Sequence, residues 1–310
     1  MKILITGGCG YIGSLLIPEL LKEGHKITNI DTQWFGNFLK KDKNLKNVKC
    51  DIRNIPDKYF KNIKAIIHLA NIANDPTAEL MPNLSWEVNV LGSYKIINQA
   101  RKNKIKKFIF GSSGSVYGVK KEKKVHEDLS LKPISTYNKT KMIAERVFLS
   151  YKKDLIVNII RPATVCGVSP RMRLDISVNL LTYAACKKKN IIVLGGNQVR
   201  PNIHIKDMVR VYKFFLKKNY KSGFYNAGFE NTKIIDIAKK IKSKINSKIT
   251  IKPSNDPRSY RQDSSKLLNL GFIPKYSIEN AIEDLIDFYK NFKFSNKNLS
   301  VKWLKKNKIK

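Results

Sequence analysis

Acidic residues, cysteines and long apolar runs are all scarce in this chain of 310 residues. The cysteines are Cys9, Cys50, Cys166 and Cys186. They form no Cys-x-x-Cys pair, so neither a disulfide framework nor a metal site is indicated, and a reducing, cytoplasmic environment is expected. Apolar runs such as 66–70 are too short to cross a bilayer, and Gly7 and Gly8 follow the N-terminus too closely for a signal peptide. We therefore expect no metal and no membrane partner.

Only 24 Asp and Glu residues stand against 60 Lys and Arg residues, which gives a formal net charge of +36. Such an excess has to be weighed as a sign of nucleic-acid binding. The lysines are spread over nearly every segment and lack interleaved aromatic residues for base stacking, so we predict no nucleic-acid partner. The one concentrated basic stretch is the tail 293–310, whose simplest interpretation is a solvated chain end.

The first half of the chain alternates short β-type apolar runs with longer amphipathic segments. Strands are predicted over 3–6, 26–30, 65–69, 107–110 and 155–160, and helices over 11–23, 85–103 and 136–151. Repeated strand–helix–strand units imply a parallel sheet covered on both faces. We therefore predict an α/β fold with a Rossmann-type doubly wound parallel sheet.

A glycine-rich turn follows the first predicted strand directly and opens a helix. In this turn, 6–13, Gly7 permits the tight bend, Gly10 lets the backbone approach a pyrophosphate, and Gly13 lets the helix pack closely. The amides at the start of the helix remain free to bind an anion. Strand, turn and helix together are the context that a dinucleotide-binding motif requires.

The acidic residues after the next strands bear on the choice of cofactor. Asp31 ends the second predicted strand, where a carboxylate can accept hydrogen bonds from the adenosine ribose; a plain turn residue is the alternative. No Arg lies between Gly13 and Asp51, so a phosphorylated ribose would find no partner and NAD is favoured. Asp51 and Ile52 could flank the adenine, although Asp51 could equally be a helix N-cap.

Beyond Arg161 and Pro162, glycines and prolines divide the chain into shorter units. We expect residues 1–165 to form the NAD-binding Rossmann domain, with a returning segment over 203–227. Residues 166–310 are expected to form a smaller mixed C-terminal lobe that binds the substrate.

The catalytic candidates are Tyr137 and Lys141, which share a helix face at a spacing of i and i+4. The same spacing occurs by chance elsewhere in a chain so rich in lysine. Context selects Tyr137, because its helix follows a strand that ends in Ser112 and Ser113. We expect Tyr137 to take a proton from a substrate hydroxyl, Lys141 to lower the pKa of the phenol, and Ser113 to hold the reacting oxygen.

These motifs resemble the extended short-chain dehydrogenase/reductase family, the NAD-dependent epimerases and dehydratases of sugar nucleotides. The likeness includes the glycine turn, the fourth-strand motif 68–71, the helix motif 89–92 and the catalytic segments 112–118 and 137–141. The resemblance implies cofactor contacts for Tyr11, Ile12, Leu69, Ala70 and Asn89, in addition to Tyr137 and Lys141. It also implies a homodimer that pairs through the helices 85–103 and 136–151.

In the C-terminal half the resemblance implies a nucleotide-diphosphate sugar as the partner. Arg200 stands where the family has an arginine that contacts the diphosphate, although Pro201 and Asn202 replace the usual residues after it. Arg258 looks like a second phosphate clamp. The stretch 169–175 is similar to the corresponding stretch of a family branch that acts on activated sugars of surface polysaccharides. The resemblance also implies that Asn179, beyond this stretch, is a further substrate residue.

Departures from the family pattern narrow the reaction. Family 4,6-dehydratases carry Asp-Glu after the catalytic hydroxyl residue, where this chain has Gly114 and Ser115. Family 3,5-epimerases have a cysteine at the position of Ser115, and decarboxylases carry a glutamate after the catalytic Ser or Thr. The leading hypothesis is a 4-epimerase that oxidises the sugar to a 4-keto form and reduces it again. A nucleotide-sugar 4-dehydrogenase or reductase is the alternative, and a non-catalytic dinucleotide-binding regulatory protein is a remote one.

Overall fold

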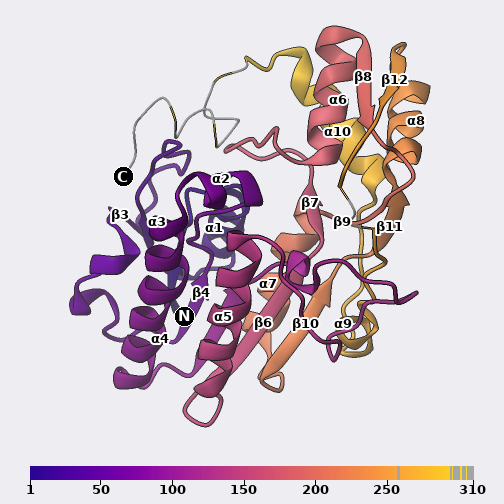
Figure 1. The fold of residues 1–310 in the computed structure, drawn as a ribbon. Helices are drawn as coiled ribbons and strands as arrows, with labels where there is room; N and C mark the ends of the chain where they lie inside the picture. Colours follow the sequence, from indigo (N-terminus) through magenta and orange to yellow (C-terminus); the bar gives the residue numbers. More distant parts are fainter. Residues whose placement is uncertain (257–258, 294, 296–300, 302–304, 306–310) are drawn as a thin grey trace.

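A seven-stranded parallel sheet forms the body of the protein, in the order β10-β6-β5-β4-β1-β2-β3. The computed structural model describes residues 1–256, 259–293, 295, 301 and 305. The strands of the sheet are β1 (Lys2–Thr6), β2 (Lys26–Asp31), β3 (Leu45–Lys49), β4 (Ala65–His68), β5 (Lys107–Gly111), β6 (Ile156–Pro162) and β10 (Gly223–Ala227). The Rossmann-type parallel sheet predicted from the sequence is therefore confirmed (Figure 1).

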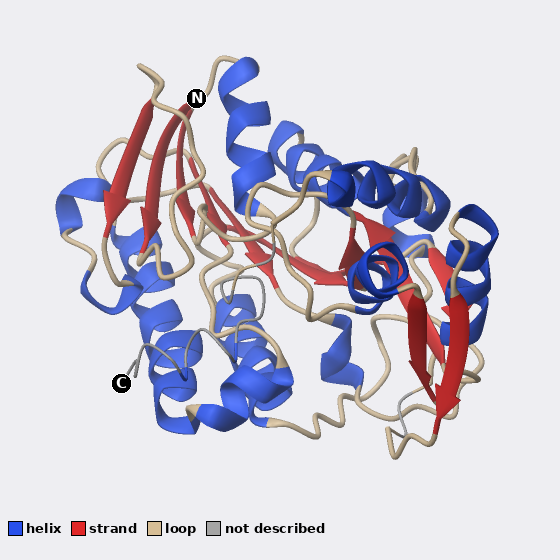
Figure 2. Cartoon of the chain, turned by 90° about the horizontal axis from the view of Figure 1, so that it is seen from above, coloured by secondary structure: helices blue, strands red, loops and turns tan. Residues whose placement is uncertain are grey.

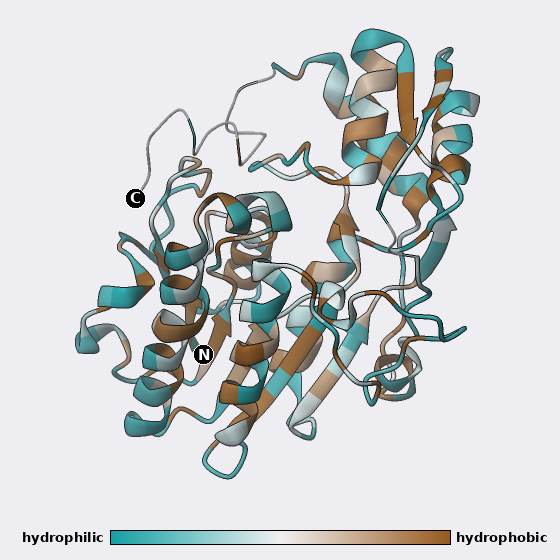
Figure 3. Ribbon diagram, viewed as in Figure 1, coloured by the Kyte–Doolittle hydropathy of each residue, from teal (hydrophilic) through white to brown (hydrophobic). Residues whose placement is uncertain are grey.

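Helices cover both faces of this sheet, because alternate strand residues point to opposite sides and both sets are apolar. On one face, α1 (Gly13–Lys22) and α7 (Ile205–Lys217) pack against a cluster that includes Ile3 and Ile109. On the other face, α4 (Ser93–Lys102) and α5 (Thr136–Ser150) pack against a cluster that includes Phe108 and Phe110. Figure 2 shows these two helical layers, and in Figure 3 the interior strand β6, between β10 and β5, is largely hydrophobic.

The C-terminal lobe contains two small sheets and its own core. One sheet has the order β11-β9-β7 and the other pairs β12 with β8. Its strands are β7 (Thr164–Cys166), β8 (Asn190–Leu194), β9 (Val199–His204), β11 (Glu230–Lys233) and β12 (Lys248–Lys252). Its helices are α6 (Ser177–Lys188), α8 (Ile234–Lys244) and α10 (Ile278–Lys290), whereas α9 (Ser265–Asn269) packs beside β10 of the main sheet. A separate apolar cluster joins α6, α8 and α10 to β8.

The chain returns to the main sheet after entering the lobe. Helix α7 packs on the face with α1, and β10 pairs with β6, so the return extends from 205 to 227. Residues 203 and 204, which we had assigned to the returning segment, belong instead to β9 of the small sheet. Most of the basic tail 293–310 lies outside the described residues.

The helix predicted over 85–103 is not one regular α-helix. It consists of α3 (Pro82–Trp86), the π-helical segment η3 (Glu87–Gly92) and α4, and a short helix α2 (Asp75–Leu80) precedes it. Spacing in the sequence does not reveal this widened turn, which lies where the Asn89 side chain bonds both to the loop after β4 and to α5. No helix among the described residues is long and apolar enough to span a membrane.

Candidate active site

A cavity of about 740 Å³ opens at the carboxyl ends of the main strands, between the sheet and the C-terminal lobe. Its wall includes residues that follow four neighbouring strands, namely Gly7, Leu69, Ser112 and Ala163. The edge where parallel strands end is the usual ligand-binding position of open α/β sheets. The sheet topology therefore brings the glycine turn and the catalytic segments to one cavity.

The glycine turn lines one side of this cavity and fits a dinucleotide. Gly7 has a φ of +77°, and a Cβ there would lie 2.5 Å from the Ala70 backbone nitrogen. A Cβ on Gly13 would lie 2.5 Å from the Gly8 Cα, so this glycine lets α1 begin against the turn itself. At Gly10 a Cβ would meet only the Gly7 carbonyl, at 3.0 Å. The turn thus leaves an open cradle of backbone for a pyrophosphate at the start of α1.

Asp31 lies in the wall beyond the glycine turn. Its carboxylate accepts hydrogen bonds from the backbone amides of Cys9 at 2.9 Å and Gln33 at 2.6 Å. Burial raises the pKa of this carboxyl, while those two amides and the charge of Arg171 lower it. Arg171, which stacks 4.1 Å from the Phe35 ring centroid, comes from the lobe and was not expected so close to Asp31.

Two further residues predicted to bind the adenine, Asp51 and Ile52, also line the cavity. Asp51 is at the same time the N-cap of η1 (Ile52–Asn54) and forms an ion pair with Arg53 at 2.9 Å. Both interpretations of Asp51 from the sequence are therefore compatible with its position.

Ser113, Tyr137 and Lys141 line the same end of the cavity. Ser113 follows β5, and Tyr137 and Lys141 lie one turn apart on α5. The Lys141 ammonium donates to the Gly111 carbonyl at 2.6 Å and lies 4.5 Å from the Phe110 ring centroid. The structure thus brings the three candidate catalytic side chains together, at the opposite end of the cavity from Asp31.

Burial works against both charged forms at this end of the cavity. It raises the pKa of the Tyr137 phenol to about 12, although a hydrogen bond with Ser113 and the charge of Arg173 oppose the rise. Burial lowers the pKa of the Lys141 ammonium to about 7, and the carboxylate of Glu145 opposes the fall. Without a bound ligand, the Tyr137 phenol is therefore protonated at neutral pH. It needs added positive charge from a bound ligand to act as a base.

A buried ion pair between Glu145 and Arg161 lies beside Lys141 and includes a residue of the same helix, α5. Glu145 lies one turn beyond Lys141, and its carboxylate accepts from Arg161 Nε at 3.0 Å and Nη2 at 2.8 Å. The same carboxylate accepts from the Ser112 hydroxyl at 2.5 Å. Arg161 also donates to the Tyr117 hydroxyl at 2.9 Å. Strand β5, helix α5 and strand β6 are therefore joined next to the catalytic residues.

Three more residues lie at the catalytic end of the cavity, and the sequence did not predict what their side chains bond to. Ser115, Arg173 and Asp175 line it. Arg173 pairs with Asp175 through two bonds of 2.8 and 3.1 Å, and Asp175 accepts from Asn74 at 2.5 Å. The pairing of Arg173 with Asp175 is not visible in the spacing of the sequence. A carboxylate two residues after an arginine was the only available indication.

Two residues predicted to contact a ligand do not line the cavity in this structure, and their ligand contacts stay predictions. Asn89 was expected to touch the cofactor, but it does not line the cavity and is fully buried. Its amide is occupied by the Ile72 backbone and by the Thr140 hydroxyl at 3.0 Å. The loop after β4 and helix α5 are held together by this side chain.

Asn179 was expected to touch the substrate and is likewise fully buried outside the cavity wall. It accepts from the Gly167 amide at 3.0 Å and donates to the Tyr11 hydroxyl at 3.1 Å and to the Arg173 carbonyl at 3.0 Å. Tyr11 in turn donates to the Gly167 carbonyl at 2.7 Å. These bonds tie the glycine turn to the lobe, so Asn179 positions the wall of the cavity.

The arginine pair predicted to hold phosphate is only partly described. Arg200 lines the cavity and donates to Asp256 at 2.8 Å. Arg258 lies outside the described residues. Ile12, Leu69 and Ala70, which were expected to contact the cofactor, all line the cavity.

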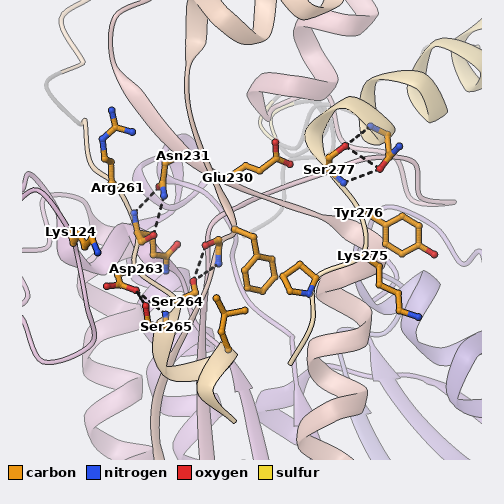
Figure 4. Close-up of a pocket in the computed structure, with 16 residues that line it drawn as sticks. Lys124, Glu230, Asn231, Arg261, Asp263, Ser264, Ser265, Lys275, Tyr276 and Ser277 are labelled. Carbon is orange, nitrogen blue, oxygen red and sulfur yellow. Dashed lines mark hydrogen bonds between the residues drawn. The ribbon is translucent and has the colours of Figure 1, made fainter. Parts of the chain in front are cut away.

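A second cavity, of about 620 Å³, lies between β11, α9 and the start of α10 (Figure 4). Its polar side chains bond to one another or to nearby backbone. Asn231 bonds to the Gln262 backbone, Asp263 to Ser265, and Ser277 to Asn280. None of the candidate catalytic residues lines it. Among the described residues, no group of His, Cys, Asp or Glu could hold a metal ion.

Comparisons with known proteins agree with this geometry. A family model described as the NAD dependent epimerase/dehydratase family matches residues 3–228. A UDP-glucose 4-epimerase of Lactobacillus helveticus is 29% identical, over 92% of this chain and 95% of that protein. The uncharacterised UDP-glucose epimerase YtcB of Bacillus subtilis is 30% identical, over 93% of this chain and 98% of that protein.

A solved structure is similar over the same extent. The UDP-glucuronic acid 4-epimerase of Bacillus cereus, in complex with UDP-glucuronic acid and NAD, superposes with a TM-score of 0.82. It is 27% identical, and the match covers 94% of this chain and 99% of that one. The likeness therefore includes both the main sheet and the lobe.

We predict that Glu145→Gln lowers the free energy of unfolding by about 3–5 kcal/mol, because it leaves the Arg161 guanidinium buried without its counter-charge. Urea unfolding followed by circular dichroism measures the change.

The matched control is Glu283→Gln, which removes the partner of Lys244 in an ion pair whose glutamate is half exposed. This control should cost ~1 kcal/mol or less. Equal losses in the two variants would contradict a structural role for the buried pair.

Proposed function

The chain belongs to the NAD-dependent epimerase/dehydratase family, and we propose that it is an NAD-dependent epimerase that inverts C4 of a nucleotide sugar. One observation carries the proposal: Ser113, Tyr137 and Lys141 line one end of a cavity whose other end is the glycine turn and Asp31. This arrangement sets a base, a cation and a hydroxyl donor where the reacting end of a bound dinucleotide would lie.

NAD, when bound, supplies the acceptor and donor of hydride. Tyr137 takes the proton of the sugar hydroxyl as the carbon is oxidised and returns a proton when the ketone is reduced. Lys141 and the positive charge of the oxidised cofactor lower the pKa of the phenol, which burial alone raises to about 12. Ser113 holds the oxygen that changes between hydroxyl and carbonyl.

The environment of Ser115 supports epimerisation over dehydration. Eliminating water requires an acid and a base beside the hydroxyl residue, and position 115 supplies only a hydroxyl that donates to Asn138 at 2.6 Å. The carboxylate of Asp175 is engaged by Arg173, and that of Asp75 accepts from Ser135 at 2.5 Å. The engaged state of these carboxylates argues against their use as free acids or bases.

The alternative is a nucleotide-sugar 4-dehydrogenase or reductase, which uses the same three residues and releases the product after one hydride transfer. A non-catalytic regulatory protein is disfavoured, because it has no physical need for a matched hydroxyl, phenol and ammonium in one cavity.

We propose that the substrate carries a nucleoside diphosphate, with Arg200 as the phosphate contact from the lobe. The epimerases from L. helveticus and B. cereus bear UDP-sugars in their names, which supports UDP as the first nucleotide to test. Residues 1–165 with the returning helix α7 and strand β10 would then bind NAD, and the lobe would bind the sugar nucleotide. Production of activated sugars for surface polysaccharides in the cytoplasm is the setting that we propose.

We also propose a homodimer formed through α3, η3, α4 and α5. Trp86, Leu91 and Tyr94 on the first three segments are 39%, 58% and 46% exposed. Large apolar side chains so exposed on consecutive helical turns are typical of a surface that a partner covers.

Incubation with UDP-, GDP- and dTDP-sugars should give one sugar inverted at C4 without net NADH. The product is identified by proton NMR, and NADH is followed by its absorbance. Lasting accumulation of NADH with a 4-keto product would favour the dehydrogenase, and no conversion of any sugar would contradict both activities.

We expect Tyr137→Phe to lower kcat by about 10²–10⁴-fold, because the phenol is the group that accepts the proton. The NAD content of the purified protein should stay at the parental level. The control is Tyr183→Phe, since Tyr183 and Lys187 have the same spacing on α6 in the lobe. A Tyr137→Phe variant as active as the parent would refute the assignment of the base.

A Leu91→Glu variant should shift the protein from dimer to monomer in light scattering coupled to size exclusion, because it places a charge in the apolar helical surface. Ile273→Glu serves as the control, since Ile273 is 70% exposed and follows α9, which packs beside β10. A monomeric parent protein would contradict the proposed dimer.

A further inference from the structure

Ser113, Ser115 and Asn138 form a continuous chain of hydrogen bonds beside the catalytic phenol. The two serine hydroxyls lie 2.7 Å apart, and Ser115 donates to the Asn138 carbonyl oxygen Oδ1 at 2.6 Å. The Ser115 backbone amide also donates to the Ser113 hydroxyl at 3.2 Å. Ser115 belongs to the short helix η4 (Gly114–Tyr117), and Asn138 follows Tyr137 on α5. Asn138 is fully buried.

The proton count along this chain fixes its direction. An amide oxygen can only accept, so the single proton of Ser115 is used on Asn138. Ser115 can then only accept from Ser113, whose own proton is directed away from the substrate side. In this direction Ser113 offers the reacting oxygen no hydrogen bond.

Rotating the Asn138 side-chain amide by half a turn reverses the direction of every hydrogen bond between Asn138, Ser115 and Ser113. The nitrogen Nδ2 is buried and has no hydrogen-bond partner among the described residues. The two ends of an amide have nearly the same shape, so the turn needs no repacking. With Nδ2 facing Ser115, each group donates to the next, and the Ser113 proton is released toward the cavity.

We propose that Ser115 and Asn138 are positioning residues that act as a reversible relay and set whether Ser113 accepts or donates a hydrogen bond at the reacting oxygen. This inference rests on the proposed function, because Ser113 must donate as the sugar hydroxyl becomes a carbonyl. Neither residue touches the substrate in this role. The relay lets one serine stabilise a ketone without leaving an unpaired hydroxyl in the cavity when no ketone is present.

The test is a double-mutant cycle with Ser115→Ala, Asn138→Ala and the double variant, measured as kcat and KM for the sugar that the parent epimerises. Each single variant should lower kcat about 3- to 10-fold, the loss of one neutral hydrogen bond. KM should change by less than about 2-fold. The double variant should be no slower than either single variant, because each change alone breaks the relay.

Two further variants separate this role from a general loss of packing. Ser115→Thr keeps the hydroxyl and should retain the parental kcat. Ser85→Ala removes another buried serine hydroxyl, which donates to the Met81 carbonyl at 2.8 Å on α3, and should leave kcat unchanged. Urea unfolding midpoints show that the variants are folded, and Ser115→Ala, which removes a single atom, decides the test if Asn138→Ala is too unstable to purify.

Multiplicative losses of kcat in the double variant would overturn the relay, as would an unchanged kcat in Ser115→Ala. A raised KM at constant kcat would also overturn it, since the two residues would then act on binding. In these cases the parent enzyme is active and the proposed function stands. A parent inert toward every sugar nucleotide would contradict the proposed function and the relay together.

Discussion

The buried carboxylate of Glu145 is the interaction on which the rest of the site depends. The Glu145 carboxylate on α5 accepts from Ser112, directly after β5, and from Arg161 on β6, so it ties the helix of Tyr137 and Lys141 to two paired strands of the sheet. An unpaired charge at this depth would be prohibitive, so Glu145 and Arg161 have to be buried together. Lys141, one turn away, gains a nearby negative charge that opposes the effect of its own burial.

The parallel sheet explains why these groups face a dinucleotide. Strands that run in one direction end at one edge, so the glycine turn after β1 and the serines after β5 reach the same cavity. The lobe closes this cavity from the other side with Arg171, Arg173 and Arg200. Two of these arginines are paired with aspartates of the cavity wall, Arg173 with Asp175 and Arg200 with Asp256.

Further polar side chains join Ser113, Tyr137 and Lys141 at the catalytic end of the cavity. Ser115 and Asn138 extend the hydroxyl of Ser113 into a chain of hydrogen bonds, and Arg173 contributes charge toward Tyr137. Ser115 and Arg173 also line the cavity, so the surroundings of the Tyr137 phenol and the Ser113 hydroxyl include further polar and charged groups.

The parallel sheet and the glycine turn could be deduced from the sequence alone, because strand periodicity and a tight turn are local properties. The neighbours of Tyr137 in the chain were enough to select it among several Tyr–Lys pairs, and it lines the cavity, while its role as the base stays a prediction. The hydrogen-bond partners of the buried side chains depended on the tertiary structure. Asn89 and Asn179 resemble ligand contacts in a motif, but only packing determines that their amides bond to backbone and to Tyr11 or Thr140. The pairing of Glu145 with Arg161 likewise joins residues of two elements whose adjacency no local pattern encodes.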